Sequence, residues 1–142
     1  GMQSESDCLM CGAGTYQSGS GIESVEGCSL CDGGKFQTGA GMVHGGNCTL
    51  CGAGKYGTGT GVAAEAGCVL CMPGTYQTGV GMVGASNCSI CVVGKYQQSP
   101  GMANESDCLL CAAGKYQSGA GMTAEASCLP CAAGSYSTGL GQ

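Results

Sequence analysis

The stretch CGAGKYGTGTGVAAEAGCVLC, residues 51–71, contains the pattern from which the whole chain is built. A glycine follows its first cysteine by three residues, the aromatic Tyr56 comes two residues later, and a Cys-x-x-Cys pair ends it. Cutting the 142 residues every twenty positions gives seven repeats that align without a gap. The repeats span residues 1–20, 21–40, 41–60, 61–80, 81–100, 101–120 and 121–140, and Gly141-Gln142 begins an eighth. Repeat positions are numbered from 1 to 20, so that Cys51 occupies position 11.

Glycine marks fixed points of the repeat. It occupies positions 1 and 14 of every repeat and accounts for 30 of the 142 residues. Such regular placement predicts tight turns, since glycine reaches positive φ angles at little steric cost. The same regularity argues against a flexible glycine linker. Glycine does not recur at every third residue, which excludes a collagen helix.

Large apolar side chains are few and recur at three positions. Position 16 holds every aromatic residue of the chain, and positions 2 and 10 are mostly Met, Leu, Ile or Val. One repeat cannot bury a core of its own with these, but stacked repeats can share one. No segment shows the 3.6-residue apolar period of a helix. We therefore predict a small disulfide-rich tandem repeat: an elongated solenoid-like rod of short β-strands and turns with little or no helix. Extended segments are expected at positions 8–11 and 15–18.

The 14 cysteines occur only as Cys-x-x-Cys, at positions 8 and 11 of every repeat. Three chemistries fit such pairs. The spacing suits a four-thiolate zinc centre, but seven pairs do not divide into whole sites. A thioredoxin-like redox pair needs a helix N-terminus, for which the sequence gives no sign. We favour a ladder of structural disulfides, because a cysteine-rich chain with a small core needs covalent links.

Disulfide connectivity cannot be deduced strictly from a sequence, but a periodic array leaves few choices. Bonds within each Cys-x-x-Cys would leave the repeats unconnected. Bonds from the second cysteine of one repeat to the first of the next would close a loop of about 18 residues, worth about 3 kcal/mol each in chain entropy. The expected pairs are then Cys11–Cys28, Cys31–Cys48, Cys51–Cys68, Cys71–Cys88, Cys91–Cys108 and Cys111–Cys128. Cys8 and Cys131 would bond to repeats outside this window, so we expect a fragment of a longer array.

The run from Cys51 to Cys71, with C-x-x-G-[KT]-Y followed at fixed spacing by C-x-x-C, resembles the cysteine-rich repeats of tumour necrosis factor receptors. It is closer still to the ephrin-receptor-like cysteine-rich repeats found in tandem in many extracellular proteins, and protozoan variant surface proteins are also similar. The resemblance covers all seven repeats and implies the same pairing, starting with Cys11–Cys28. This sequence differs from the receptors in its regularity, because receptor modules alternate in type and have varied ligand-contacting loops.

Charge is sparse and segregated along the repeat. Four Lys and no Arg against nine acids give a net charge of −5, which offers no phosphate-neutralising surface, so we expect no nucleic-acid partner. All lysines lie at position 15 and all acids but Asp32 at positions 3–7, which predicts two separate charged stripes. We interpret these as solvated edges, with pairing of neighbouring protofilaments as the alternative. Residues 66–94 lack charge but contain Cys, Gly and polar residues throughout, so we expect no membrane span.

Three Asn-x-Ser/Thr sequons fall in the variable, polar part of the repeat, at Asn47, Asn87 and Asn104, where we expect surface glycans. The sequence offers no catalytic constellation. His44 is the only histidine and has no repeated partner, and no phosphate-binding loop or EF-hand pattern is present. We therefore expect no enzyme, no metal site and no cofactor.

These features predict a structural, non-enzymatic component of an extracellular or cell-surface filament, appendage or coat. Inter-repeat disulfides would stiffen it, glycans would cover it, and copies would self-assemble into a fibre. The alternative is a receptor or adhesin ectodomain that binds a protein ligand through the repeats. Ligand sites usually need a distinct patch of aromatic or Arg anchors, and every aromatic residue here belongs to the repeat.

Overall fold

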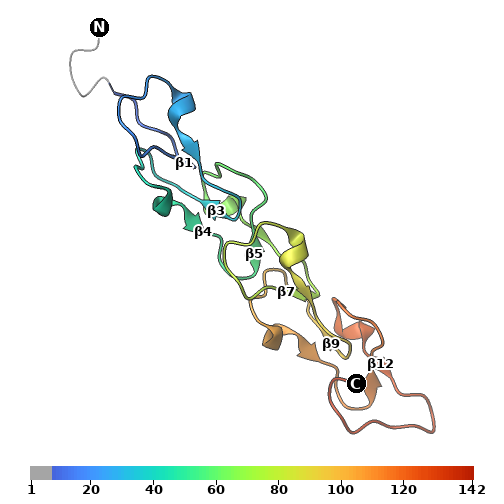
Figure 1. Ribbon diagram of the computed structural model, residues 1–142. Coiled ribbons are helices and arrows are strands. Elements are labelled where there is room, and N and C mark those ends of the chain that lie inside the picture. The colour runs from blue at the N-terminus through green and yellow to red at the C-terminus, as the bar shows by residue number, and fades with distance from the viewer. Residues whose placement is uncertain (1–7) are drawn as a thin grey trace.

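The computed structural model describes residues 8–142, which form one elongated rod (Figure 1). The repeats follow one another along the rod in chain order, so the colour in Figure 1 runs from blue at one end to red at the other. This arrangement confirms the predicted fold class, a disulfide-rich tandem-repeat rod of short strands and turns.

The strands are two residues long and pair antiparallel across repeat boundaries. Positions 15–16 of one repeat pair with positions 9–10 of the next; in the third pair Lys55 lies opposite Leu70 and Tyr56 opposite Val69. The six pairs are β1 (Thr15–Tyr16) with β2 (Ser29–Leu30), β3 (Lys35–Phe36) with β4 (Thr49–Leu50), β5 (Lys55–Tyr56) with β6 (Val69–Leu70), β7 (Thr75–Tyr76) with β8 (Ser89–Ile90), β9 (Lys95–Tyr96) with β10 (Leu109–Leu110), and β11 (Lys115–Tyr116) with β12 (Leu129–Pro130). The strands therefore lie within the segments that the sequence predicts to be extended.

Glycine at position 14 shapes the turn that leads into each first strand. In the third repeat, the backbone N–H of Lys55 donates to the carbonyl of Gly52 at 3.2 Å, and Gly54 has φ +77°. A turn of this kind needs a positive φ at its third residue, which glycine supplies without strain.

A single 3-10 turn precedes the first cysteine of repeats two to seven. In η4 the N–H of Cys68 donates to the carbonyl of Glu65 at 2.8 Å. The turns are η2 (Val25–Gly27), η3 (Gly45–Asn47), η4 (Glu65–Gly67), η5 (Ala85–Asn87), η6 (Glu105–Asp107) and η7 (Glu125–Ser127). Three-residue turns carry no apolar period, so the sequence pattern does not reveal them.

Backbone hydrogen bonds stack each loop on the loops that follow it. The N–H of Gly61 donates to the carbonyl of Cys31 at 2.7 Å, the N–H of Gln37 to the carbonyl of Val62 at 3.0 Å, and the N–H of Gly34 to the carbonyl of Gly57 at 2.7 Å. Equivalent bonds recur at the same repeat positions along the rod. Each repeat is therefore placed on its neighbours by one recurring set of contacts, as in other solenoids.

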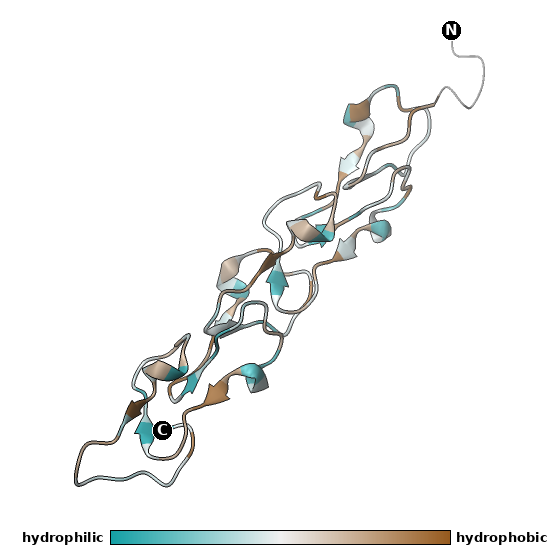
Figure 2. Cartoon of the chain, turned by 180° about the vertical axis from the view of Figure 1, so that it is seen from behind, coloured by the Kyte–Doolittle hydropathy of each residue, from teal (hydrophilic) through white to brown (hydrophobic). Residues whose placement is uncertain are grey.

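The core of the rod consists of sulfur and amide groups. The cysteines at position 11 are 0–1% exposed in repeats two to six, and the position 17 glutamines Gln37, Gln77, Gln97 and Gln117 are buried. The position 10 side chains are not: Leu30 is 55% exposed and Leu70 is 44% exposed. Figure 2 shows hydrophobic and hydrophilic segments interspersed along the rod. The expectation of a shared aliphatic core is wrong at position 10, since both residues of each second strand are exposed, as Val69 and Leu70 show.

Candidate functional site

Six disulfides run the length of the rod, one for each strand pair. Each joins position 11 of one repeat to position 8 of the next, with Cα atoms 5.6–5.8 Å apart. The bonded pairs are Cys11–Cys28, Cys31–Cys48, Cys51–Cys68, Cys71–Cys88, Cys91–Cys108 and Cys111–Cys128, the same pairs that the resemblance implies. Within residues 8–142, Cys8 and Cys131 are free, the first exposed and the second half-buried.

Each bond is positioned by the turns on either side of it. The position 11 cysteine precedes the glycine turn, and the position 8 cysteine ends the 3-10 turn, with Cys68 in extended backbone after η4. The N–H of Cys51 donates to the carbonyl of Gly34 at 2.8 Å, which fixes the other end of the bond. Sulfur atoms joined in this way are not available as thiolate ligands. Over residues 8–142 no group of three or more His, Cys, Asp or Glu side chains could hold a metal ion.

Lysine at position 15 forms an ion pair with glutamate at position 5 of the next repeat. The Nζ–Oε1 distance is 2.7 Å for Lys55 and Glu65. The corresponding distances are 3.2 Å for Lys95–Glu105 and 3.4 Å for Lys115–Glu125. The prediction of two separate charged stripes is therefore wrong. The strand that holds the lysine and the 3-10 turn that holds the glutamate are the two arms of one disulfide-closed loop.

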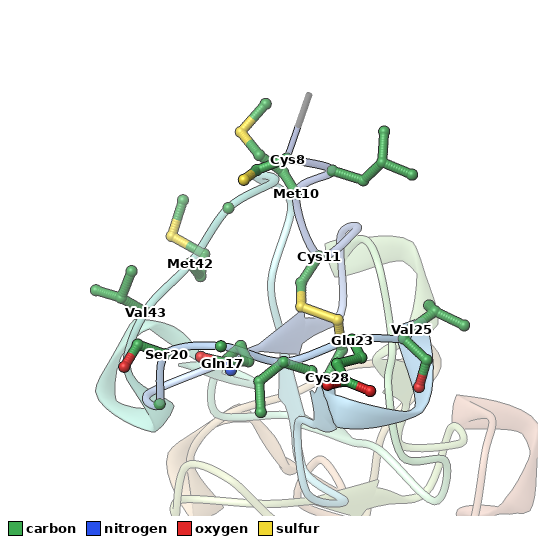
Figure 3. A pocket seen from close by; sticks show the side chains of 16 residues that line it. Cys8, Met10, Cys11, Gln17, Ser20, Glu23, Val25, Cys28, Met42 and Val43 are labelled. Atoms are coloured by element: carbon green, nitrogen blue, oxygen red, sulfur yellow. A yellow bond between two sulfur atoms is a disulfide. The ribbon is translucent and has the colours of Figure 1, made fainter. Parts of the chain in front are cut away.

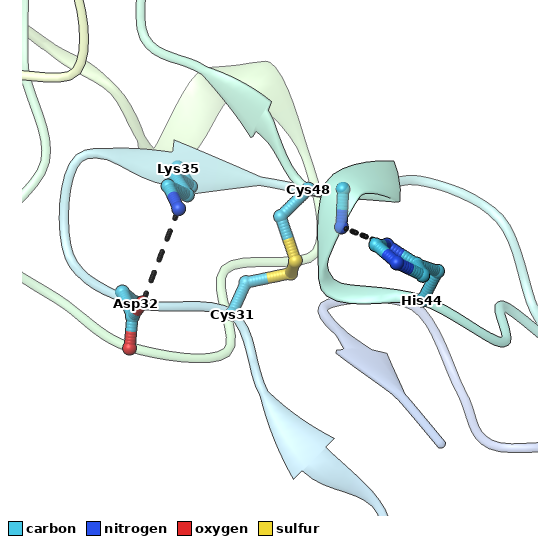
Figure 4. A network of polar contacts seen from close by, with 6 residues as sticks. Cys31, Asp32, Lys35, His44 and Cys48 are labelled. Carbon is cyan, nitrogen blue, oxygen red and sulfur yellow. Dashed lines mark hydrogen bonds and ion pairs between the residues drawn. A yellow bond between two sulfur atoms is a disulfide. The ribbon is translucent and has the colours of Figure 1, made fainter. Parts of the chain in front are cut away.

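The sequence contains a signal for these pairs that the repeat pattern alone does not show. A glutamate stands at position 5 wherever the preceding repeat has Lys55, Lys95 or Lys115, whereas Thr75 is followed by Ala85. Lys35 is the exception, because Gly45 occupies position 5 of the next repeat. It lies instead 3.9 Å from Asp32 in its own repeat (Figure 4).

The Lys55 ammonium hydrogen-bonds to Glu65 and attracts its charge, and these two effects hold the pKa of the Glu65 carboxyl below its ordinary value. A side-chain hydrogen bond with Ser24 likewise holds the pKa of Glu26 below its ordinary value. Both carboxyls are exposed, so both are ionised at neutral pH and neither resembles the protonated acid of a hydrolase.

His44 has a structural role in one turn. It is exposed, and its Nδ1 accepts a hydrogen bond from the N–H of Gly46 at 2.8 Å, which caps η3 next to the Cys31–Cys48 bond (Figure 4). This use suits a glycine-rich turn that has no Ser, Thr or Asp at its start. The contact does not place His44 beside a nucleophile or a second titratable partner.

The three sequon asparagines are exposed and lie at the 3-10 turns. Asn47 ends η3, Asn87 ends η5, and Asn104 immediately precedes η6. The Asn87 Oδ1 accepts a hydrogen bond from the N–H of Gly84 at 3.1 Å. All three are therefore accessible for modification.

Residues 59–108 match the family described as tyrosine-protein kinase ephrin type A/B receptor-like. No curated protein matches the chain. Together with the disulfide-closed loops in series, the family match identifies the chain as a tandem array of cysteine-rich repeats resembling the ephrin-receptor-like module. Multiple disulfides and a module of this kind indicate an extracellular domain. Over the described residues, no helix has the length and apolar character to cross a bilayer.

Proposed function

We propose that the array is the shaft of an extracellular filament, appendage or surface coat, with a mechanical and not a catalytic role. The observation that carries this proposal is the recurrence of one hydrogen-bond set at every step of the rod. The N–H of the position 1 glycine bonds to a position 11 carbonyl at 2.7–2.8 Å from Gly41 to Gly141. Identical contacts generate one repeated screw operation, which suits a shaft that is uniform along its length.

The disulfides support a mechanical role. Almost no large apolar side chain is buried, so non-covalent packing contributes little to holding a repeat together. A covalent bond across each loop, together with a backbone hydrogen-bond ladder, would resist pulling and proteolysis where packing alone would not. Cys8 and Cys131 occupy the same repeat positions as paired cysteines, which supports the proposal that they bond to further repeats outside this sequence.

Self-assembly and glycosylation complete the proposal. The position 10 side chains are about half exposed in successive repeats, from Leu30 to Leu110, and offer lateral contacts between rods at regular intervals. Glycans at Asn47, Asn87 and Asn104 would extend from the 3-10 turns without disturbing the sulfur core. The sugars would then limit which faces of the rod can meet.

Electron microscopy of the native material tests the structural role. We expect fibres whose diffraction shows one axial repeat, together with sedimentation that depends on protein concentration. Intact-mass measurement before and after enzymatic deglycosylation reports the sugars separately. A chain that stays a single rod at all concentrations, with no fibre in the native material, would contradict the proposal.

A receptor or adhesin ectodomain is the second candidate, and the description of the matched family favours it. A ligand-binding array would concentrate affinity in one locally distinct patch. Alanine substitutions at equivalent exposed positions of successive repeats separate the two functions. A ligand site would respond in one repeat only, whereas a fibre contact would respond similarly in several.

A further inference from the structure

The six disulfides differ in how well their outer sulfur is covered. The position 11 cysteines are fully buried in the middle of the rod, so a reagent can approach a bond only from its position 8 cysteine. Cys68, Cys108 and Cys128 are 6%, 4% and 4% exposed, whereas Cys88 is only half-buried. These three cysteines belong to loops that contain a Lys–Glu ion pair, whereas the fourth buried position 8 cysteine, Cys48, belongs to a loop without one.

The loop closed by Cys71–Cys88 lacks that ion pair. Its positions 15 and 5 hold Thr75 and Ala85, whose side chains are too short to meet across the loop. A hollow of about 230 Å³ lies there, lined by Tyr56, Met72, Thr75, Ala85, Cys88 and Ile90. Both residues that replace the ion pair thus line the hollow together with Cys88.

The first loop shows the same relationship. Thr15 and Val25 stand where other loops have Lys and Glu, and a hollow of about 840 Å³ reaches both Cys11 and Cys28 (Figure 3). The free Cys8 also lines this hollow, so a thiol of the same chain competes with any external one. The Cys71–Cys88 bond is easier to interpret, because it lies away from the ends of the rod.

The third loop without an inter-repeat ion pair is closed by Cys31–Cys48. Its position 5 residue is Gly45, and a Cβ atom there would lie 3.2 Å from the Tyr16 Cζ, so the Tyr16 ring packs against the turn. Cys48 is 8% exposed.

We propose that Cys71–Cys88 is a thiol–disulfide exchange site that uncharged small thiols open before its neighbours. The thiolate attacks the Sγ of Cys88, the bond to Cys71 breaks, and Cys71 leaves as a thiolate while Cys88 forms a mixed disulfide. A second small thiolate attacks that mixed disulfide, releases Cys88 and forms the external disulfide. Two small thiols thereby supply the two electrons that reduce the protein bond. The apolar lining from Tyr56, Met72 and Ile90 favours a small thiol that has no other charged group over one that carries an additional charge.

Reduction of this one bond would open a single loop, while the other loops stay closed by their disulfides. Cys51–Cys68 precedes this bond and Cys91–Cys108 follows it, and both lie under ion pairs. Reduction at Cys71–Cys88 would release one loop while the bonds on either side remain. The inference is independent of whether rods assemble into fibres.

Timed reduction of the full chain tests the proposal. Cys8 and Cys131 are first blocked, a limiting amount of 2-mercaptoethanol is added, and new thiols are trapped with N-ethylmaleimide for peptide mass mapping. We expect Cys71 and Cys88 to be trapped about tenfold faster than the cysteines of the two neighbouring bonds, because rates of exchange depend on access to the attacked sulfur. Equal rates at the three bonds, or loss of all of them in one step, would overturn the proposal.

Two reciprocal variants identify the cause. Thr75→Lys with Ala85→Glu installs the missing ion pair and should slow trapping at Cys88 to the rate measured for Cys68. Lys55→Thr with Glu65→Ala removes an existing pair and should accelerate trapping at Cys68, with Cys108 unchanged as the internal standard. A misfolded first variant would expose all six bonds at once, and the second variant still gives an independent result. Unchanged rates in both variants would contradict the assignment.

Discussion

The carbonyl oxygen of Gly101 lies so close to Gly54 that a Cβ atom on Gly54 would overlap it. These glycines are more than two repeats apart in the sequence. The same approach joins Gly14 to Gly61, Gly34 to Gly81, and Gly74 to Gly121. In the first five repeats position 14 therefore requires glycine for two reasons: the turn needs a positive φ angle, and the loop stacked on it leaves no space for a side chain.

Substitution of Gly54 should destabilise the rod far more than substitution of Gly52, two residues away. Gly54→Ala places a Cβ against backbone and forces a left-handed conformation, for which we expect a loss of more than about 2 kcal/mol. Nothing lies within 4 Å of a Cβ at Gly52, so Gly52→Ala should stay within about 0.5 kcal/mol of the wild type. Thermal unfolding followed by circular dichroism measures both. Equal effects would show that stacking does not exclude a side chain at position 14.

The disulfide pairing predicts a specific peptide map. Digestion of unreduced protein should release six linked peptide pairs, each joining position 11 of one repeat to position 8 of the next. Replacing both Cys91 and Cys108 with alanine removes one bond and should cost about 3 kcal/mol in chemical denaturation, since the closed loop no longer constrains the unfolded chain. Cys131→Ala removes a free thiol and should change little. Links within a Cys-x-x-Cys would disprove the pairing.

The Lys55–Glu65 pair predicts a contribution to stability that depends on pH. The pKa of Glu65 is lower in the folded chain than its ordinary value, so the unfolded chain binds this proton first. The contribution is therefore fully present above the ordinary glutamate pKa of about 4.3 and is lost as the pH falls through the lower folded value. Glu65→Gln should reduce the slope of stability against pH in this acidic range, measured by urea denaturation at a series of pH values.

Glu23→Gln is the matched control, since no ion pair of Glu23 is found over residues 8–142. It should leave the acidic slope close to that of the wild type. High salt should weaken the effect at Glu65, because an exposed pair is screened. A slope that is identical in all three proteins would show that the ion pair does not affect folding.

The sequence predicts those parts of the fold that depend on repetition. Regular glycines such as Gly54 predict the turns, and the cysteine spacing together with a family resemblance leads to Cys51–Cys68. The composition of the core cannot be predicted in this way, because burial of Gln77 instead of Leu70 depends on how loops stack. The glutamine at position 17 is a polar residue. Its burial follows from backbone hydrogen bonds between repeats, such as the bond from the Gly54 N–H to the Gln77 carbonyl. The ion pairs depend similarly on a loop geometry that only the 3-10 turn defines.

The buried glutamines allow a sharp test of the unusual core. Gln97 is 6% exposed; its Oε1 accepts a hydrogen bond from the N–H of Ser99 at 2.7 Å, and its Nε2 donates to the carbonyl of Asp107. Gln77 is 3% exposed, and neither amide atom has a hydrogen-bond partner over the described residues. The two side chains therefore occupy equivalent positions with opposite hydrogen-bonding states.

Replacing each glutamine with methionine keeps the length of the side chain and removes its polar atoms. Gln97→Met should cost about 1–3 kcal/mol, because the Ser99 N–H and the Asp107 carbonyl lose their partner. Gln77→Met removes an uncompensated buried amide and should be neutral or stabilising. Chemical denaturation of both variants, with peptide maps to confirm unchanged disulfides, measures the difference. Equal destabilisation would mean that the Gln77 amide is hydrogen-bonded in solution.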